Sequence, residues 1–144
     1  RDRAINIGCR VALYNHGGWF GEPENQLAII EALGQQDVGI VYNFHHAHDQ
    51  FDRYPKFLDQ ILPHLVCINL SGITADGPKI LTIGEGEEEQ VMIEALLDRG
   101  FQGPFGILGH IKDEDAKIVL QRNIDGLNAL FPSPSAISPS DGSR

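Results

Sequence analysis

Histidine is the residue type in this sequence best suited to chemistry, and it is unevenly distributed. Three of the six histidines lie within four positions, in the segment VGIVYNFHHAHD, directly after an apolar run. Imidazole accepts or donates a proton near neutral pH, and it also binds transition metals. The spacing therefore points to acid–base chemistry or a metal site at the end of a buried strand.

Apolar, β-branched segments alternate with segments of helical periodicity along the chain. Strands are expected at 10–15, 38–44, 65–70 and 105–108. Helices are expected at 24–33, 54–62, 87–99 and 113–130. Strands that are apolar on both faces and alternate with amphipathic helices predict a parallel sheet covered by helices.

Two α/β architectures fit this pattern, and the sequence leaves both open. One is the C-terminal half of a (β/α)8 TIM barrel, since four consecutive βα units are half of what a barrel of roughly 250 residues requires. The other is a small open parallel α/β sheet. The phosphate-binding motifs GxGxxG and GxxxxGK[ST], typical of open nucleotide-binding sheets, do not occur.

In both architectures, ligands bind beyond the carboxyl ends of the strands. We call this edge the rim; it comprises the segments 14–19, 43–48, 69–85 and 109–110. Five of the six histidines fall there, whereas His64 precedes a strand and is expected at the opposite end. The predicted rim also carries amides suited to binding hydroxyl groups, and one tryptophan: Asn15, Asn43, Asn69 and Trp19.

Each of these features also has a purely structural interpretation. The HHAH segment can be a solvated loop, and His110 can be a helix cap or a surface residue. Trp19 can be a lid or a core anchor instead of a platform for sugar stacking. The acidic run 85–89 is typical of the first turn of a helix, where carboxylates meet the positive end of the dipole. Within that run, Glu85 lies between two glycines and is the candidate for the site.

Length and composition indicate one domain. With 144 residues, 42% of them apolar, the chain is long enough for one core and too short for two comfortable domains. We expect residues 1–131 to form the C-terminal part of a barrel, and the Pro- and Ser-rich residues 132–144 to be a disordered tail. Because the chain begins at Arg1 rather than Met, a trimmed upstream portion is one alternative.

Charge and hydropathy argue against several classes of protein. The 20 acidic and 11 basic residues give a net charge of −9, which repels phosphate backbones and disfavours nucleic-acid binding. No apolar run approaches the ~18 residues of a membrane span, and the N-terminus does not resemble a signal peptide. We therefore expect a soluble, cytoplasmic protein. Cys9 and Cys67 lie in or beside apolar segments without metal-ligand spacing and are expected to be buried thiols.

The segments at the strand ends resemble a known family. ALYNHGG, VGIVYNFHHAH, IGEGEEE and GFQGPFGILGH look like the last four strand-and-loop units of the xylose-isomerase-like TIM barrel family. The family includes sugar phosphate isomerases and epimerases and enzymes similar to endonuclease IV (AP endonuclease family 2). The resemblance runs from about Cys9 to Leu130 and implies a (β/α)8 barrel with a divalent metal held at the rim by Glu, Asp and His. The sugar chemistry that it implies is proton or hydride movement between adjacent carbons of a metal-bound hydroxy-carbonyl group.

The match to the family's ligands is partial. Tyr14 and Asn43 stand where the family has a Glu and an Asp, while His16, His46 and the GEG around Glu85 remain. The seventh strand's usual His and Asp fall at Asn69 and Gly72, and the last Glu falls near Gly109 or His110.

The replacement of the family's acidic ligands affects which metal ion the site could bind. Hard cations favour anionic oxygen, so the loss of carboxylates argues against magnesium. One expectation is a divalent metal such as Zn²⁺ or Mn²⁺ bound by His16, His46, His48 and His110, although the missing acidic ligands weigh against it. The other is acid–base and hydrogen-bonding chemistry without metal.

Two functional hypotheses follow. The first is a sugar or sugar-phosphate isomerase or epimerase, with His46, His16 and Glu85 as catalytic residues and Asn15, Trp19, Asn43 and Asn69 binding the substrate. The alternative is a carbohydrate-binding pseudoenzyme that has lost the acidic metal ligands. A DNA hydrolase is least favoured, because it needs several carboxylates and a basic groove. With few cationic side chains near the rim, a neutral sugar is favoured over a phosphorylated one.

A half-barrel exposes strand edges and an apolar interior, which a stable protein does not leave open. The expected partners are therefore a small-molecule carbohydrate and either an N-terminal half-barrel or a second half-barrel copy that closes the sheet. Nucleic acid and membrane are not expected as partners.

Overall fold

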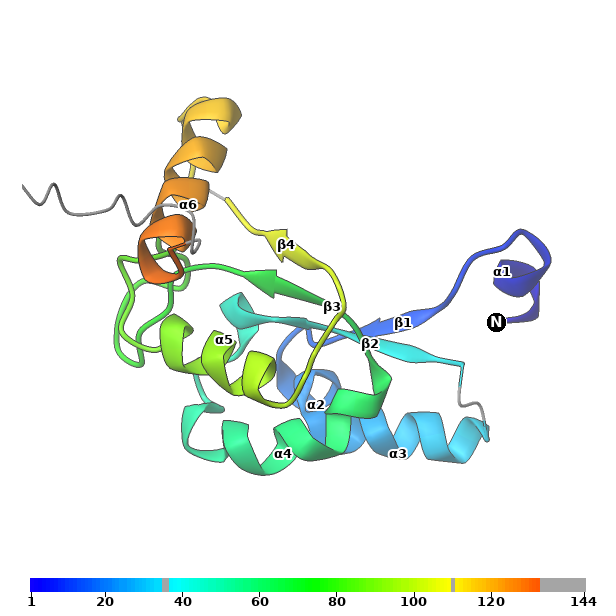
Figure 1. Ribbon diagram of the computed structural model, residues 1–144. Coiled ribbons are helices and arrows are strands. Elements are labelled where there is room, and N and C mark those ends of the chain that lie inside the picture. The colour runs from blue at the N-terminus through cyan, green and yellow to red at the C-terminus, as the bar shows by residue number, and fades with distance from the viewer. Residues whose placement is uncertain (35–36, 110, 133–144) are drawn as a thin grey trace, which may run out of the picture.

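The computed structural model describes residues 1–34, 37–109 and 111–132, and its centre is a four-stranded sheet. The strands pair in chain order, β1 beside β2, β2 beside β3 and β3 beside β4, and every pair is parallel (Figure 1). Their bounds are β1 (Ala12–Tyr14), β2 (Gly39–Asn43), β3 (Leu65–Leu70) and β4 (Phe105–Ile107). The predicted parallel sheet of four consecutive βα units is confirmed.

Each strand is followed by a helix near its predicted position. These helices are α3 (Pro23–Leu33), α4 (Tyr54–Ile61), α5 (Glu89–Asp98) and α6 (Ala116–Leu130). The sequence did not predict α1 (Asp2–Asn6), α2 (Gly18–Gly21) or the single 3-10 turns Phe44–His46, Phe51–Arg53 and Leu62–His64. Helix α2 begins at Gly18. Gly17, which precedes it, and Gly18 have φ of 60° and 58°, a backbone conformation that glycine adopts readily.

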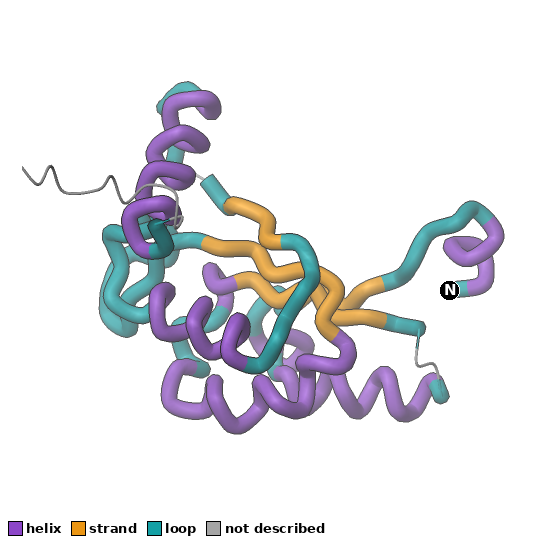
Figure 2. Tube along the Cα trace, viewed as in Figure 1, coloured by secondary structure: helices purple, strands orange, loops and turns teal. Residues whose placement is uncertain are grey.

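The core lies between one face of the sheet and helices α3, α4 and α5, which Figure 2 shows on the same side. Ile40 and Tyr42 of β2 point to this side and are fully buried. The ring of Tyr42 lies against those of Tyr54 and Phe57 of α4, with centroids 5.9 and 5.8 Å apart. The predicted apolar face of the second helix is therefore confirmed, and burial of these large rings is a main stabilising term.

The opposite face of the sheet is only half-buried. Pairing register brings together Tyr14, Val41 and Cys67 on this face, followed by Asn69 nearer the rim. All four are partly exposed, in contrast to Tyr42 and Ile68 on the core side. Among the described residues, no helix lies over β1 and β2 on this side (Figure 1). This is the surface that would face the interior of a closed barrel.

The two cysteines are free, and the expectation that both are buried is wrong for Cys9. Cys9 is exposed because it lies in the connection between α1 and β1, before the strand begins. Cys67 is partly exposed because its side chain lies on the half-buried face. In the described part of the chain, no helix is both long and apolar enough to cross a membrane.

Helix α6 packs against the connection that precedes α5. Asn123 is buried; its Oδ1 accepts a hydrogen bond from the Ile83 N–H at 3.0 Å, and its Nδ2 donates to the Val119 carbonyl at 2.9 Å. One turn later, Gly126 lies so close to the Ile83 carbonyl that an added Cβ would overlap it. The close approach of helix and loop thus requires glycine at position 126.

We predict that Gly126→Ala lowers the free energy of unfolding by about 1–3 kcal/mol, because the new methyl group must push α6 away from Ile83. This loss is expected even though alanine is the better helix former by about 1 kcal/mol. Urea denaturation measures it, with Asn128→Ala, an exposed change on the same helix, as the control. A Gly126→Ala protein as stable as the control would contradict this packing.

Candidate functional site

Aromatic and imidazole rings from the ends of β1 and β2 meet at the rim. The ring centroids of His16 and His46 are 4.9 Å apart, and that of Tyr14 lies 6.2 and 5.6 Å from them. His45 adds a fourth ring, 4.4 Å from His46. The structure therefore brings together the two histidines that the sequence placed at the centre of the site.

Two asparagines at the rim join the strand ends. The fully buried Asn15 receives a hydrogen bond from the Asn43 N–H at 2.7 Å and donates one to the Asn43 carbonyl at 3.1 Å. The Asn43 side chain donates to the Tyr14 hydroxyl and accepts from the His45 N–H at 3.0 Å. Both amides serve the protein's own groups here, and a role in substrate binding stays a prediction. Asn69, paired in register with Asn43, is half-exposed on the open face and stays a candidate.

The surroundings of His46 keep its ring neutral. Burial of the ring lowers the pKa of His46 to about 4, and the neighbouring rings of His45 and His16 add to the shift. At neutral pH the imidazole therefore offers one nitrogen lone pair and one N–H. Such a group can accept a proton or a hydrogen bond from a ligand.

The other two histidines of the HHAH segment are held by backbone carbonyls of a distant loop. His48 has Nδ1 2.9 Å from the Thr74 oxygen and Nε2 3.0 Å from the Lys79 oxygen. Nδ1 of His45 lies 3.0 Å from the same Lys79 oxygen. Because a carbonyl only accepts, each contact is a hydrogen bond when that ring nitrogen carries the proton, and a neutral His48 ring donates through one of its two nitrogens at a time. The segment is therefore not a freely solvated loop.

The donor set fits a metal poorly in the described part of the chain. There, no three or more His, Cys, Asp or Glu side chains converge as metal ligands would. Both nitrogens of His48 lie against carbonyl oxygens, so coordination would require this ring to turn away. The fourth candidate, His110, lies outside the described residues. The predicted four-histidine site accordingly stays a prediction.

The acidic run contributes one buried carboxylate, that of Glu89, while the catalytic role of Glu85 stays a prediction. Glu85 is exposed, in a shallow surface pocket beside Arg122 and Asp125 of α6. Glu89, four residues later, is 1% exposed and accepts three backbone hydrogen bonds. The sequence contained an indication that Glu89 is buried, because it lies three and four positions before Met92 and Ile93 and therefore on the same face of the helix.

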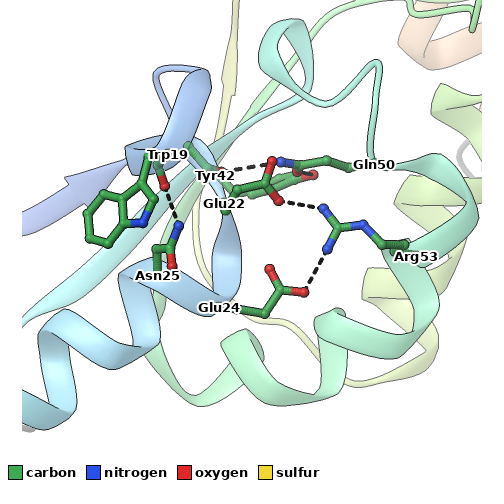
Figure 3. Close-up of polar contacts among 8 residues, drawn as sticks. Trp19, Glu22, Glu24, Asn25, Tyr42, Gln50 and Arg53 are labelled. Atoms are coloured by element: carbon green, nitrogen blue, oxygen red, sulfur yellow. Dashed lines mark hydrogen bonds and ion pairs between the residues drawn. The ribbon is translucent and has the colours of Figure 1, made fainter.

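Trp19 lies on the surface of α2 with 66% of its area exposed, so it is not a core anchor. Its carbonyl accepts a hydrogen bond of 2.7 Å from Asn25 Nδ2. Figure 3 shows the indole beside Asn25 and directed away from Gln50 and Arg53. An exposed ring beside the rim can stack on a ligand, and substrate binding by Trp19 stays a prediction.

A polar network that the sequence analysis missed fixes the position of α2. The Tyr42 hydroxyl donates to Gln50 Oε1 at 2.8 Å, and Gln50 Nε2 donates to the Gly21 carbonyl at 3.2 Å. Arg53 pairs with Glu22 and Glu24 at 2.5 and 2.7 Å (Figure 3). The chain after the HHAH segment is thereby tied to the chain after His16. The contacts of Gln50 with Gly21 and of Arg53 with Glu22 and Glu24 join residues 29 to 31 positions apart, and no sequence pattern links such distant residues.

Comparisons with known proteins support the fold. No protein-family model matches the sequence, and no curated protein matches it. Among solved structures, it is similar to a 3-keto-D-glucoside 4-epimerase from E. coli (19% identity, TM-score 0.70), covering 90% of this chain and 48% of that one. A D-psicose 3-epimerase crystallised with D-fructose is similar over 90% of this chain and 50% of that chain (15% identity, TM-score 0.65).

A xylose isomerase domain protein from Planctomyces limnophilus is also similar (18% identity, TM-score 0.63), over 90% of this chain and 47% of that one. The chain thus spans about half the length of these solved structures. Its fold is that of half of a TIM barrel, in agreement with the predicted half-barrel of four consecutive βα units.

We predict that the ring of His46 titrates near pH 4 in the folded protein, well below the ~6.5 of an exposed histidine. Because the fold favours neutral His46, its contribution to stability is present above about pH 6.5 and is lost as pH falls towards 4. Ring-proton NMR measures the titration, with His46→Gln to assign the signal. A midpoint at or above the ordinary value would contradict the buried environment of this ring.

Proposed function

We propose that this chain contributes the rim of a sugar isomerase or epimerase, with His46 and His16 as its acid–base pair. The observation that carries the proposal is the approach of these two imidazoles, with centroids 4.9 Å apart, at the carboxyl ends of neighbouring parallel strands. In TIM barrels this end of the sheet holds the active site. Similar solved structures include epimerases of neutral keto-sugars, which supports a neutral carbohydrate as the substrate.

The chemistry needs a group that moves a proton between adjacent positions of a hydroxy-carbonyl compound. Neutral His46 has a nitrogen lone pair free for the proton, and its lowered pKa makes it a weak base that readily passes the proton on. His16, exposed on the next strand end, is positioned to exchange the proton with solvent or return it. The Tyr14 hydroxyl, fixed by Asn43, lies beside both rings and can donate a hydrogen bond to the sugar carbonyl. No step is assigned to a metal, because the described donor set lacks carboxylates.

The alternative function is carbohydrate binding without catalysis. The resemblance implies metal-binding carboxylates at positions 14 and 43, but this chain has the phenol of Tyr14 and the amide of Asn43 there. The two groups form a hydrogen bond with each other, which favours the alternative. Such groups bind hydroxyls but cannot replace an anionic ligand.

Either function requires a closed site. In the described structure β1 and β4 each pair on one side only, and the barrel-interior face is half-buried. Four further strands would pair both edges and cover that face. We propose that these come from an N-terminal half-barrel or from a second copy of the chain, consistent with coverage of about half of the similar structures.

Deuterium incorporation tests the catalytic proposal. The protein with its site closed, by an N-terminal half-barrel or by a second copy of the chain, is incubated in D2O with neutral keto-sugars such as D-psicose, D-tagatose and a 3-keto-glucoside, and carbon-bound deuterium is followed by NMR. Proton transfer at carbon exchanges hydrogen with solvent, so we expect incorporation that falls by about 10²–10⁴-fold in His46→Ala. His64→Ala, changed at the opposite end of β3, is the matched control. Sugar binding without exchange would favour the alternative, and neither binding nor exchange would contradict both.

Metal analysis tests the acid–base interpretation separately. We expect the protein with its closed site to retain sugar binding after dialysis against a chelator, because the groups proposed to bind the sugar are imidazole, amide and phenol groups. Sugar binding and metal content are both measured before and after dialysis. A stoichiometric transition metal that is lost in His46→Ala, but kept in His64→Ala, would instead support the predicted histidine metal site.

A further inference from the structure

The buried carboxylate of Glu89 is the least expected polar group in the structure. It opens α5, is 1% exposed and lies beneath the loop of residues 71–88. Its Oε2 accepts a hydrogen bond from the Ile73 N–H at 3.2 Å, and its Oε1 accepts from the Gly84 and Gly86 N–H groups, both at 2.9 Å. A single side chain therefore joins the beginning and the end of the loop.

The loop is closely fitted to this carboxylate. A Cβ on Gly86 would overlap Glu89 Oε2 and the backbone of Ile73, and a Cβ on Gly72 would overlap the Thr82 carbonyl. Gly72 and Leu81 exchange backbone hydrogen bonds of 2.9 and 3.1 Å. The two ends of the loop are thus fixed to each other, and its middle, residues 74–79, projects to the rim.

The middle of the loop supplies the carbonyl groups that hold the histidines. The Thr74 and Lys79 oxygens contact both nitrogens of His48, and the Lys79 oxygen also contacts His45. These contacts determine how the two rings are oriented on either side of His46. Glu89 is therefore connected to the HHAH segment by hydrogen bonds at both ends of the loop backbone that lies between them.

We propose that Glu89 is a positioning residue that fixes the loop of residues 71–88 and thereby orients the rings of His45 and His48. The inference concerns the geometry of the rim and does not depend on the proposed sugar chemistry. A carboxylate suits this role because both of its oxygens accept hydrogen bonds and neither donates one, so it can satisfy all three N–H groups that point at it. Hydrogen bonds to a charged group are also stronger than those between neutral groups.

The test compares Glu89→Gln with Glu87→Gln, an exposed change two residues earlier in the full chain. Glutamine keeps the size of the side chain but turns one acceptor into an NH2 group that faces an N–H donor. In Glu89→Gln we expect the amides of Ile73, Gly84 and Gly86 to exchange with solvent about tenfold faster or more. We also expect loss of the NMR contacts from the His48 ring to Thr74 and Lys79. The ring of His64, at the other end of β3, should be unchanged.

Circular dichroism and a thermal melt establish that each variant is folded. A folded Glu89→Gln protein whose His45 and His48 ring signals match those of Glu87→Gln would overturn the proposal. Gly86→Ala tests the loop by a second route, because its Cβ would overlap both the Glu89 carboxylate and the Ile73 backbone, and it should produce the same loss at both rings. If Glu89→Gln and Gly86→Ala both fail to fold, Glu89 is a determinant of the whole fold, and the positioning proposal is likewise overturned.

Discussion

Parallel pairing of the four strands in chain order is the constraint on which the rest of this structure depends. Parallel strands have all of their carboxyl ends at one edge, so residues that follow different strands meet although they are far apart in sequence. His16 and His46 become neighbours in this way. The crossover helices α3, α4 and α5 lie on one face of the sheet, and the other face is left for the interior of a barrel (Figure 2).

The rim is shaped by buried polar side chains that bind backbone groups. Asn15 joins two strand ends, Gln50 ties helix α2 to Tyr42, Asn123 seats α6 on Ile83, and Glu89 closes the 71–88 loop. Burying a polar group without a partner costs more than a typical hydrogen bond gains. Each of these side chains therefore favours one arrangement of the backbone that it contacts over the others.

Several residues show how far the site could be predicted. The placement of His16 and His46 at one rim followed from strand periodicity, because the pattern located the ends of two neighbouring strands. The choice of these two among the rim histidines came from the resemblance to known barrels. The burial of Glu89 and the exposure of Glu85 were not predicted from the sequence. Both lie in one acidic run, and such a run is typical of the charged first turn of a helix. The sequence did not predict that Asn15 and Asn43 bind backbone groups at the strand ends, because an amide can form hydrogen bonds with a hydroxyl ligand and with the backbone equally well.

The sequence by itself determined the fold class, since the alternation of apolar strands with amphipathic helices is a local property that each segment carries. It also determined which residues lie at the rim and which, such as His64, lie at the other end. Only the tertiary structure decided the partners of those side chains. Lys79 meets His45 and His48 from more than 30 positions away, and Asn123 meets Ile83 across 40. Such pairings depend on loop paths and packing distances that no local periodicity encodes.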